Sequence, residues 1–181
     1  VVTQLEESQE IQDYAAAYSA MKPKHEDIGK FKRKDLRPAE NLKPTFRTIR
    51  NYLAANAVGI TRDEVFASQI INLIFCKIYD ERFTRPNDTV KFRAGINEKD
   101  EDVRGRILEL FEKVKHQYND VIDVADSISL DAKCIKYIVG ELQLYSLKDS
   151  SRDAVGEAFE YFLLALRLRV HKDNSLHQEM S

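Results

Sequence analysis

Apolar residues recur at helical spacing in the second quarter of this chain. Four of them follow one another at intervals of four, three and four residues, which places them on one face of a helix: Leu42, Phe46, Ile49 and Leu53. Pro44 suits the first turn of such a helix, where its missing N–H leaves no hydrogen bond unmade, and Gly59 suits the left-handed turn that ends one. The pattern predicts a helix over residues 42–57.

A second, longer helix is predicted over residues 62–82. Thr61 and Glu64 have the spacing of a capping box. Apolar residues then continue along one side of the predicted helix: Ile70, Leu73, Ile74 and Ile78. Residues 84–102 are rich in Pro, Gly, Asn and Asp and therefore predict a loop, within which the alternating residues 89–93 indicate a short extended piece.

Helical patterns also occur toward both ends of the chain. A patchy apolar stripe predicts a helix over residues 3–21, and another helix is expected from Val103 onward. Asp131 can cap the next helix, and Ser150 or Ser151 can cap the last one. Since no set of strands suffices for a sheet, the predicted class is all-α: a compact bundle of about five to six helices.

The same patterns predict how the chain is divided. We expect an N-terminal helix over 1–21, a basic linker over 22–41, a helical bundle over 42–166 and a disordered tail over 167–181. The length of 181 residues suits one domain with a sizeable core. Cys76 and Cys134 are far apart and form no C-x-x-C, and no apolar run is long enough to span a membrane, so we expect reduced thiols in a cytoplasmic protein.

Charge is distributed unevenly along the chain. The overall net charge is −2, but residues 22–50 carry ten Lys and Arg residues and four acids, a net +6. Such a block could follow a phosphate backbone, or it could be a solvated linker balanced by the acidic helix before it. If it binds DNA, the binding should be weak and non-specific, through these candidate residues: Lys30, Lys32, Arg33, Lys34, Arg37, Arg47 and Arg50.

Three stretches of sequence resemble one protein family. They are "LKPTFRTIRNYLAANAVG" at 42–59, "QIINLIFCKIYDER" at 69–82, and 153–162, which matches a D-x-x-G-x-x-[YF]-E-[YF] pattern. Together they resemble the N-terminal helical domain of the modification subunit of type I restriction-modification systems, a family of DNA adenine-N6 methyltransferases. The resemblance implies S-adenosylmethionine as cofactor of the intact family, and a specificity subunit and a second modification subunit as partners.

The catalytic elements of that family are not found in this chain. Its six glycines form no G-x-G and its four prolines are never adjacent, whereas the methylases need a glycine-rich turn and a proline-proline loop that holds the flipped base. We therefore expect no catalytic residue and no cofactor in this chain. No metal site is expected either: the acidic clusters Asp80–Glu81 and 98–102 could hold a cation, but solvated charges are the favoured interpretation.

The final residues depart from the family. After the 153–162 pattern the family continues toward a G-Q-F-[FL]-T-P-R word, and reading the codons of 172–181 one nucleotide earlier can encode that word. We therefore expect an out-of-frame tail. The leading hypothesis is the non-catalytic helical domain, as a fragment, of such a modification subunit, serving subunit assembly and DNA holding. The alternative is a free-standing helical protein-interaction module unrelated to DNA.

Overall fold

The computed structural model describes residue 9 and residues 23–57, 63–153, 156–157 and 160. The predicted N-terminal helix over 3–21, the Thr61 capping box, most of the final helix and the tail over 167–181 lie outside these described residues. The described elements, in chain order, are the 3₁₀ turns η1 (His25–Asp27) and η2 (Arg33–Asp35), strand β1 (Arg37–Pro38), helices α2 (Lys43–Asn56), α3 (Asp63–Phe83), α4 (Asp100–Gln117) and α5 (Ala132–Leu142), and strand β2 (Tyr145–Ser146).

The all-α class is confirmed, with two differences. The described residues hold four α-helices, fewer than the five to six predicted, and they add a two-stranded parallel sheet that the sequence pattern does not predict. In that sheet Arg37 pairs with Tyr145 and Pro38 with Ser146. Strands of two residues are too short to show the alternation by which a strand is recognised in sequence.

The helices begin where their sequences favour it. Pro44 occupies the first turn of α2, and the carboxylate of Asp131 accepts a hydrogen bond of 2.8 Å from the N–H of Cys134 at the start of α5. Helix α4 begins at Asp100, three residues before the predicted Val103. Its first turn is acidic and its last turn is basic, which complements the helix dipole.

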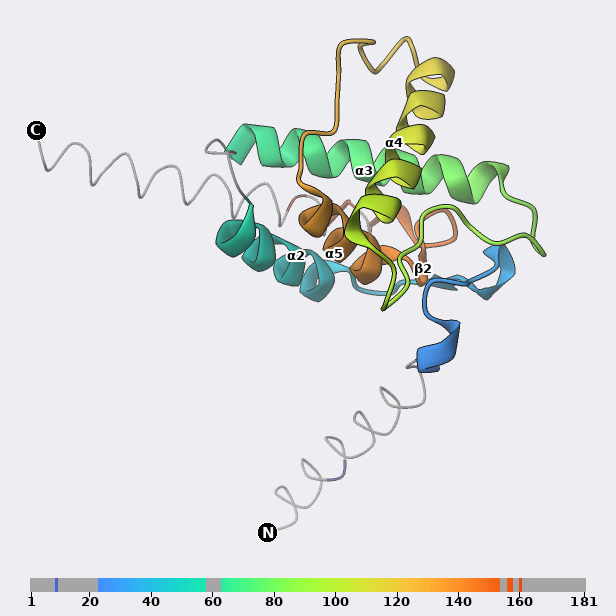
Figure 1. Ribbon diagram of the computed structural model, residues 1–181. Coiled ribbons are helices and arrows are strands. Elements are labelled where there is room, and N and C mark those ends of the chain that lie inside the picture. Colours follow the sequence, from blue (N-terminus) through green and yellow to red (C-terminus); the bar gives the residue numbers. More distant parts are fainter. Residues whose placement is uncertain (1–8, 10–22, 58–62, 154–155, 158–159, 161–181) are drawn as a thin grey trace, which may run out of the picture.

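Helix α3 is the long green helix of Figure 1, with α4 crossing it and with α2 and α5 below it. Packing joins α3 to α4, α4 to α5, and α5 to α2. The buried face of α3 includes Ile70, Leu73 and Cys76, whereas Ile74 and Ile78 are only partly buried. The two cysteines are free and buried, as expected. Among the described residues, no helix has both the length and the apolar character needed to cross a membrane.

Residues 23–41, expected to form a linker, are packed against the helices. Phe31 and Leu36 form a small second apolar cluster with Val90, and Ala39 joins the main core. This segment therefore contributes to the fold. Its few apolar residues are spaced so that they turn inward while the lysines between them stay exposed.

Candidate nucleic-acid interface

The basic segment is held to the loop after α3 by backbone hydrogen bonds. The N–H of Val90 donates to the carbonyl of Phe31, and the N–H of Arg33 donates to the carbonyl of Asp88, both at 3.0 Å. Between them Lys32 lies opposite Thr89 in an antiparallel bridge. The pairing alternates as a strand does: Phe31 and Val90 are buried, and Lys32 and Thr89 are exposed.

Lys30, Lys32 and Lys34 all keep exposed side chains on this segment. Because the backbone between them is bonded to the neighbouring loop, the segment offers three cations from a fixed position. Sequence reasoning selected these lysines by charge alone; their outward direction depends on the pairing with residues 86–90.

Arg33, a candidate on the same segment, is occupied by protein groups. Its Nε donates to the carbonyl of Glu81 at 2.8 Å, and its Nη2 pairs with the carboxylate of Asp149 at 3.0 Å. Only 13% of its side chain is exposed. The Ser146 hydroxyl and the Arg33 guanidinium both hold the pKa of Asp149 below its usual range. Arg33 thus connects the segment to the end of α3 and to the loop after β2.

The remaining three candidates are spread over two elements. Arg37 is exposed in β1, and its N–H donates to the carbonyl of Leu144. Arg47 is exposed on α2, and Arg50 is half-buried there with Nη2 donating to the Asn51 side chain. Figure 1 shows the teal helix α2 apart from the blue segment, so Arg47 and Arg50 lie on a different element from the three lysines.

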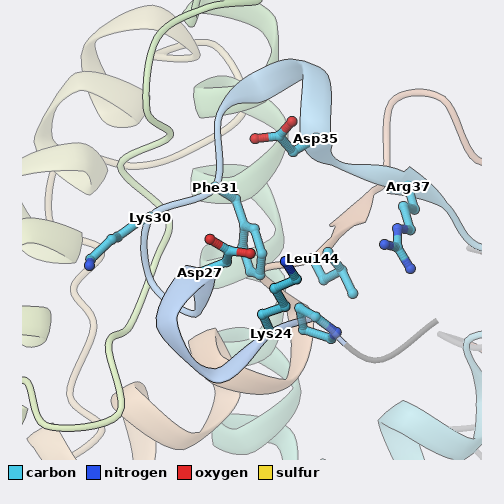
Figure 2. A pocket seen from close by; sticks show the side chains of 8 residues that line it. Lys24, Asp27, Lys30, Phe31, Asp35, Arg37 and Leu144 are labelled. Atoms are coloured by element: carbon cyan, nitrogen blue, oxygen red, sulfur yellow. The ribbon is translucent and has the colours of Figure 1, made fainter. Parts of the chain in front are cut away.

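A hollow of about 460 Å³ lies between the segment and the residue before β2 (Figure 2). Its lining is mixed in charge and consists of Pro23, Lys24, Asp27, Lys30, Phe31, Asp35, Arg37 and Leu144. In Figure 2 Phe31 and Leu144 lie at its centre, while Lys30 points away from them toward the pale-green loop. Because Asp27 and Asp35 oppose its cations, the hollow is poorly suited to an anion.

The acidic pair Asp80–Glu81 is neither solvated nor a cation site. Both side chains are buried. One oxygen of Asp80 accepts the N–H groups of Lys91 and Phe92, each at 2.7 Å, and the other accepts the Thr84 hydroxyl at 2.9 Å. A carboxylate that receives several donors needs no metal to compensate its burial.

Glu81 receives its donors from the other side of the helix end. It accepts the Ser146 hydroxyl at 2.8 Å and the N–H groups of Leu147 and Lys148, each at 3.2 Å. The ammonium of Lys77 lies 3.7 Å from it. Burial lowers the pKa of Lys77 to about 8, and the neighbouring carboxylates of Glu81 and Asp80 oppose that shift.

In the second acidic cluster, residues 98–102, Glu98 is used by the fold, whereas Asp100, Glu101 and Asp102 are exposed, as expected. Glu98 pairs with Arg106 at 2.6 Å and accepts the N–H of Gly95 at 2.9 Å. Burial raises the pKa of Glu98, but these hydrogen bonds outweigh it, so the pKa lies below its usual range. In the part of the chain that the structure describes, no group of three or more His, Cys, Asp or Glu residues could hold a metal.

Two further lysines belong to this surface but were not among the candidates. Lys91, in the loop after α3, and Lys113, on α4, are exposed, and Lys113 lowers the pKa of Lys91. The sequence separates them by twenty-two positions, so charge-block reasoning could not pair them. The available signal was the alternation of residues 89–93, which turns Lys91 outward when Val90 and Phe92 are buried.

Comparison of the chain with protein-family models, curated proteins and solved structures gives no match.

Proposed function

We propose that this chain is the non-catalytic helical domain of a type I restriction-modification modification subunit, and that it helps to hold DNA and to assemble the subunits. The first two stretches of the resemblance coincide with α2 and with α3. This function places the protein in the cytoplasm, with a specificity subunit and a second modification subunit as partners. S-adenosylmethionine and methyl transfer belong to the catalytic domain of the intact family.

The polar letters of "QIINLIFCKIYDER" support a structural role for that stretch. Gln69 uses both ends of its amide: Nε2 donates to the carbonyl of Ser127 at 3.0 Å, and Oε1 accepts the N–H of Ser129 at 2.6 Å. Asp80 and Glu81 bind two other loops in the same way. Because the polar side chains of this stretch form hydrogen bonds with loops of the same chain, the stretch suits a domain that positions partners and performs no chemistry.

The observation that carries DNA holding is the fixed row of exposed lysines. Lys30, Lys32 and Lys34 project from a segment whose backbone is bonded to the 86–90 loop. Lysines contribute to nucleic-acid binding mainly by releasing counterions from phosphates, which needs charge density and no base contacts. This fits a domain that leaves sequence reading to a specificity subunit.

The test is DNA affinity measured by fluorescence anisotropy across salt concentrations. We expect weak, non-specific binding with a dissociation constant of about 10⁻⁴ to 10⁻⁶ M. The affinity should fall steeply between roughly 50 and 200 mM salt. Changing Lys30, Lys32 and Lys34 to Glu should abolish it. A matched control changes three exposed lysines elsewhere to Glu: Lys99, Lys133 and Lys148. Equal losses in both variants, or no binding by the unmodified chain, would refute the proposal.

The alternative, an interaction module unrelated to DNA, draws on the loop after α4. Val121 is 68% exposed and Val124 is 78% exposed, so two apolar side chains three positions apart face solvent. The same surface could serve subunit assembly. The proposal is supported if the chain co-purifies with a specificity subunit and loses that complex when both valines are changed to Ser. The alternative is favoured if the chain neither binds DNA nor forms such a complex.

A further inference from the structure

We infer that Phe83, the last residue of α3, is a stacking site for an unpaired nucleobase of DNA, and that the cations around it hold the neighbouring phosphates. The inference rests on the proposed function and deepens it, because it adds a base contact to a surface described so far by charge alone. It follows from the exposure of the Phe83 ring, from the contacts that hold the ring, and from the positive charge on both sides of it.

The side chain of Phe83 is 52% exposed. Among the described residues, the other large apolar side chains that are exposed are all aliphatic: Val65, Ile96, Val121 and Val124. A single exposed apolar residue is ordinary in a folded protein. An exposed aromatic ring, however, offers a flat π surface on which a nucleobase can stack whatever its identity.

The Phe83 ring is held by residues of the same helix. The ring of Tyr79, one turn earlier, lies with its centre 4.6 Å away and its plane tilted by 41°. The guanidinium carbon of Arg82 lies 5.5 Å from the centre of the Phe83 ring, within the range of a cation–π contact. Directly after the ring, the N–H and the hydroxyl of Thr84 both donate to Asp80 at 2.9 Å. A ring held in this way loses less freedom when a ligand binds.

The basic segment is bonded to the helix end that carries this ring. The N–H of Lys34 donates to the carbonyl of Pro86 at 3.0 Å, and Nε of Arg33 donates at 2.8 Å to the carbonyl of Glu81, two residues before Phe83. Figure 1 shows the loop after α3 beside the blue segment. The exposed ring and the exposed lysines therefore belong to one fixed part of the molecule.

Positive charge dominates the two stretches that meet there, residues 30–37 and 82–89. They carry seven basic residues and two acids, a net +5: Lys30, Lys32, Arg33, Lys34, Arg37, Arg82 and Arg85 against Asp35 and Asp88. All of the basic residues except Arg33 are exposed. Proteins bind single-stranded nucleic acid by this combination, in which cations follow the backbone and aromatic rings stack with bases. Because the centre of a protein–protein interface is depleted of charge, the same combination favours a nucleic acid over a protein partner.

The test measures binding of the full chain by fluorescence anisotropy at several salt concentrations. The probes are a labelled oligothymidylate of about 20 nucleotides, whose bases are unpaired, and a duplex of the same length. Phe83→Ala is compared with Ile96→Ala, the matched control, because Ile96 is 44% exposed and lies outside both stretches. Circular dichroism and melting check that both variants are folded.

We expect Phe83→Ala to weaken oligothymidylate binding by about tenfold and to leave its salt slope unchanged, because stacking is lost and no phosphate contact is removed. Duplex binding should change by less than about twofold, since paired bases are not free to stack. Arg85→Gln should instead lower the salt slope by somewhat less than one, as expected for one lost phosphate contact on a single strand. Ile96→Ala should bind both probes as the unmodified chain does.

A second measurement is independent of any stability lost in Phe83→Ala. The chain has no Trp, so Phe83→Trp introduces a single tryptophan that keeps an aromatic surface at this position. This variant should bind oligothymidylate at least as tightly as the unmodified chain, and its fluorescence should be quenched on binding, because the indole stacks with a base. Ile96→Trp is the control and should not be quenched.

The outcomes separate the stacking site from the proposed function. If Phe83→Trp binds oligothymidylate without a change in fluorescence, or if folded Phe83→Ala binds it as well as Ile96→Ala does, stacking is wrong and DNA holding through the lysines stands. If Phe83→Ala loses only a complex with a specificity subunit, Phe83 contacts protein and stacking is again wrong. If the unmodified chain binds oligothymidylate through Phe83 but binds no duplex, the proposed function fails and the site stands. If it binds neither probe, both are wrong.

Discussion

Lys77 and Glu81 form an ion pair inside the bundle: Nζ lies 3.7 Å from Oε2, and each side chain is 1% exposed. The ammonium also lies 5.2 Å from the centre of the Phe92 ring. The pair sits where α3, the loop that carries Lys91 and the β2 loop meet, since Asp80 and Glu81 bind the last two. The pair therefore lies at the junction of α3 with these two loops.

Removing one partner of this pair should strongly destabilise the fold. Glu81→Ala leaves the Lys77 charge buried and deprives Ser146, Leu147 and Lys148 of their acceptor. We expect a loss of about 3–5 kcal/mol in the free energy of unfolding, measured by urea titration. Glu112→Ala is the matched control, because Glu112 pairs with Lys115 but is 72% exposed, and it should cost at most about 1 kcal/mol. Similar costs for the two variants would contradict the buried pair.

Stability should rise with pH just above neutrality because of Lys77. Its pKa is about 8 in the folded chain and 10.5 as the ordinary value, so between these values the unfolded state binds more protons. Through Lys77 alone, raising the pH from about 8 to 9 should add on the order of 1 kcal/mol to the free energy of unfolding. The raised pKa values of the Cys76 and Cys134 thiols act in the opposite direction from about the same pH upward, so the contribution of Lys77 is measured as the difference in pH dependence between the unmodified chain and a variant without the ion pair. A Lys77→Met, Glu81→Gln variant should lack this rise; an identical slope in that variant would argue against Lys77 as the cause.

Replacing the neighbouring residues Leu73 and Ile74 of α3 by Ala should lower the stability by different amounts. Leu73 is fully buried and Ile74 only partly so. Leu73→Ala should therefore lose about 2–5 kcal/mol of stability, and Ile74→Ala clearly less, because its site can be filled by solvent. Thermal or urea unfolding checks both. The reverse order would mean that the register of α3 is wrong.

Replacing Gly29 by Ala should destabilise the fold, whereas replacing Gly105 by Ala should stabilise it. Gly29 has φ +84°, and a Cβ there would lie 2.6 Å from the Cα of Gly95. Gly29→Ala should cost at least about 1–3 kcal/mol in strain and displaced backbone. Gly105, within α4, has nothing within 4 Å of an added Cβ, so Gly105→Ala should stabilise by about 0.5–1 kcal/mol. Two stabilising substitutions would contradict the close approach of the segment to the 94–95 loop.

Substitution of Arg33 should affect mainly stability, and substitution of Lys32 should affect mainly DNA binding. Arg33→Gln removes the ion pair with Asp149 and should lower the melting temperature, with little direct effect on DNA affinity. Lys32→Gln should do the opposite, because Lys32 is exposed and pairs only through its backbone. Melting curves and anisotropy on the same samples check this. If Arg33→Gln weakened DNA binding more than Lys32→Gln at unchanged stability, Arg33 would be a phosphate contact.

The sequence alone determined the helical class and the positions of α2, α3 and α5, because apolar spacing, Pro44 and the Asp131 cap are local signals. It also singled out the basic segment, since charge density is visible along the chain. Only the tertiary structure decided which of those charges face outward. Arg33 and Lys32 are adjacent and alike in sequence, yet pairing with residues 86–90 and the carboxylate of Asp149 bind one to the fold and leave the other exposed. Likewise the loop that carries Lys91 is held in place because the buried carboxylate of Asp80 accepts the N–H of Lys91, a contact that neither periodicity nor composition relates.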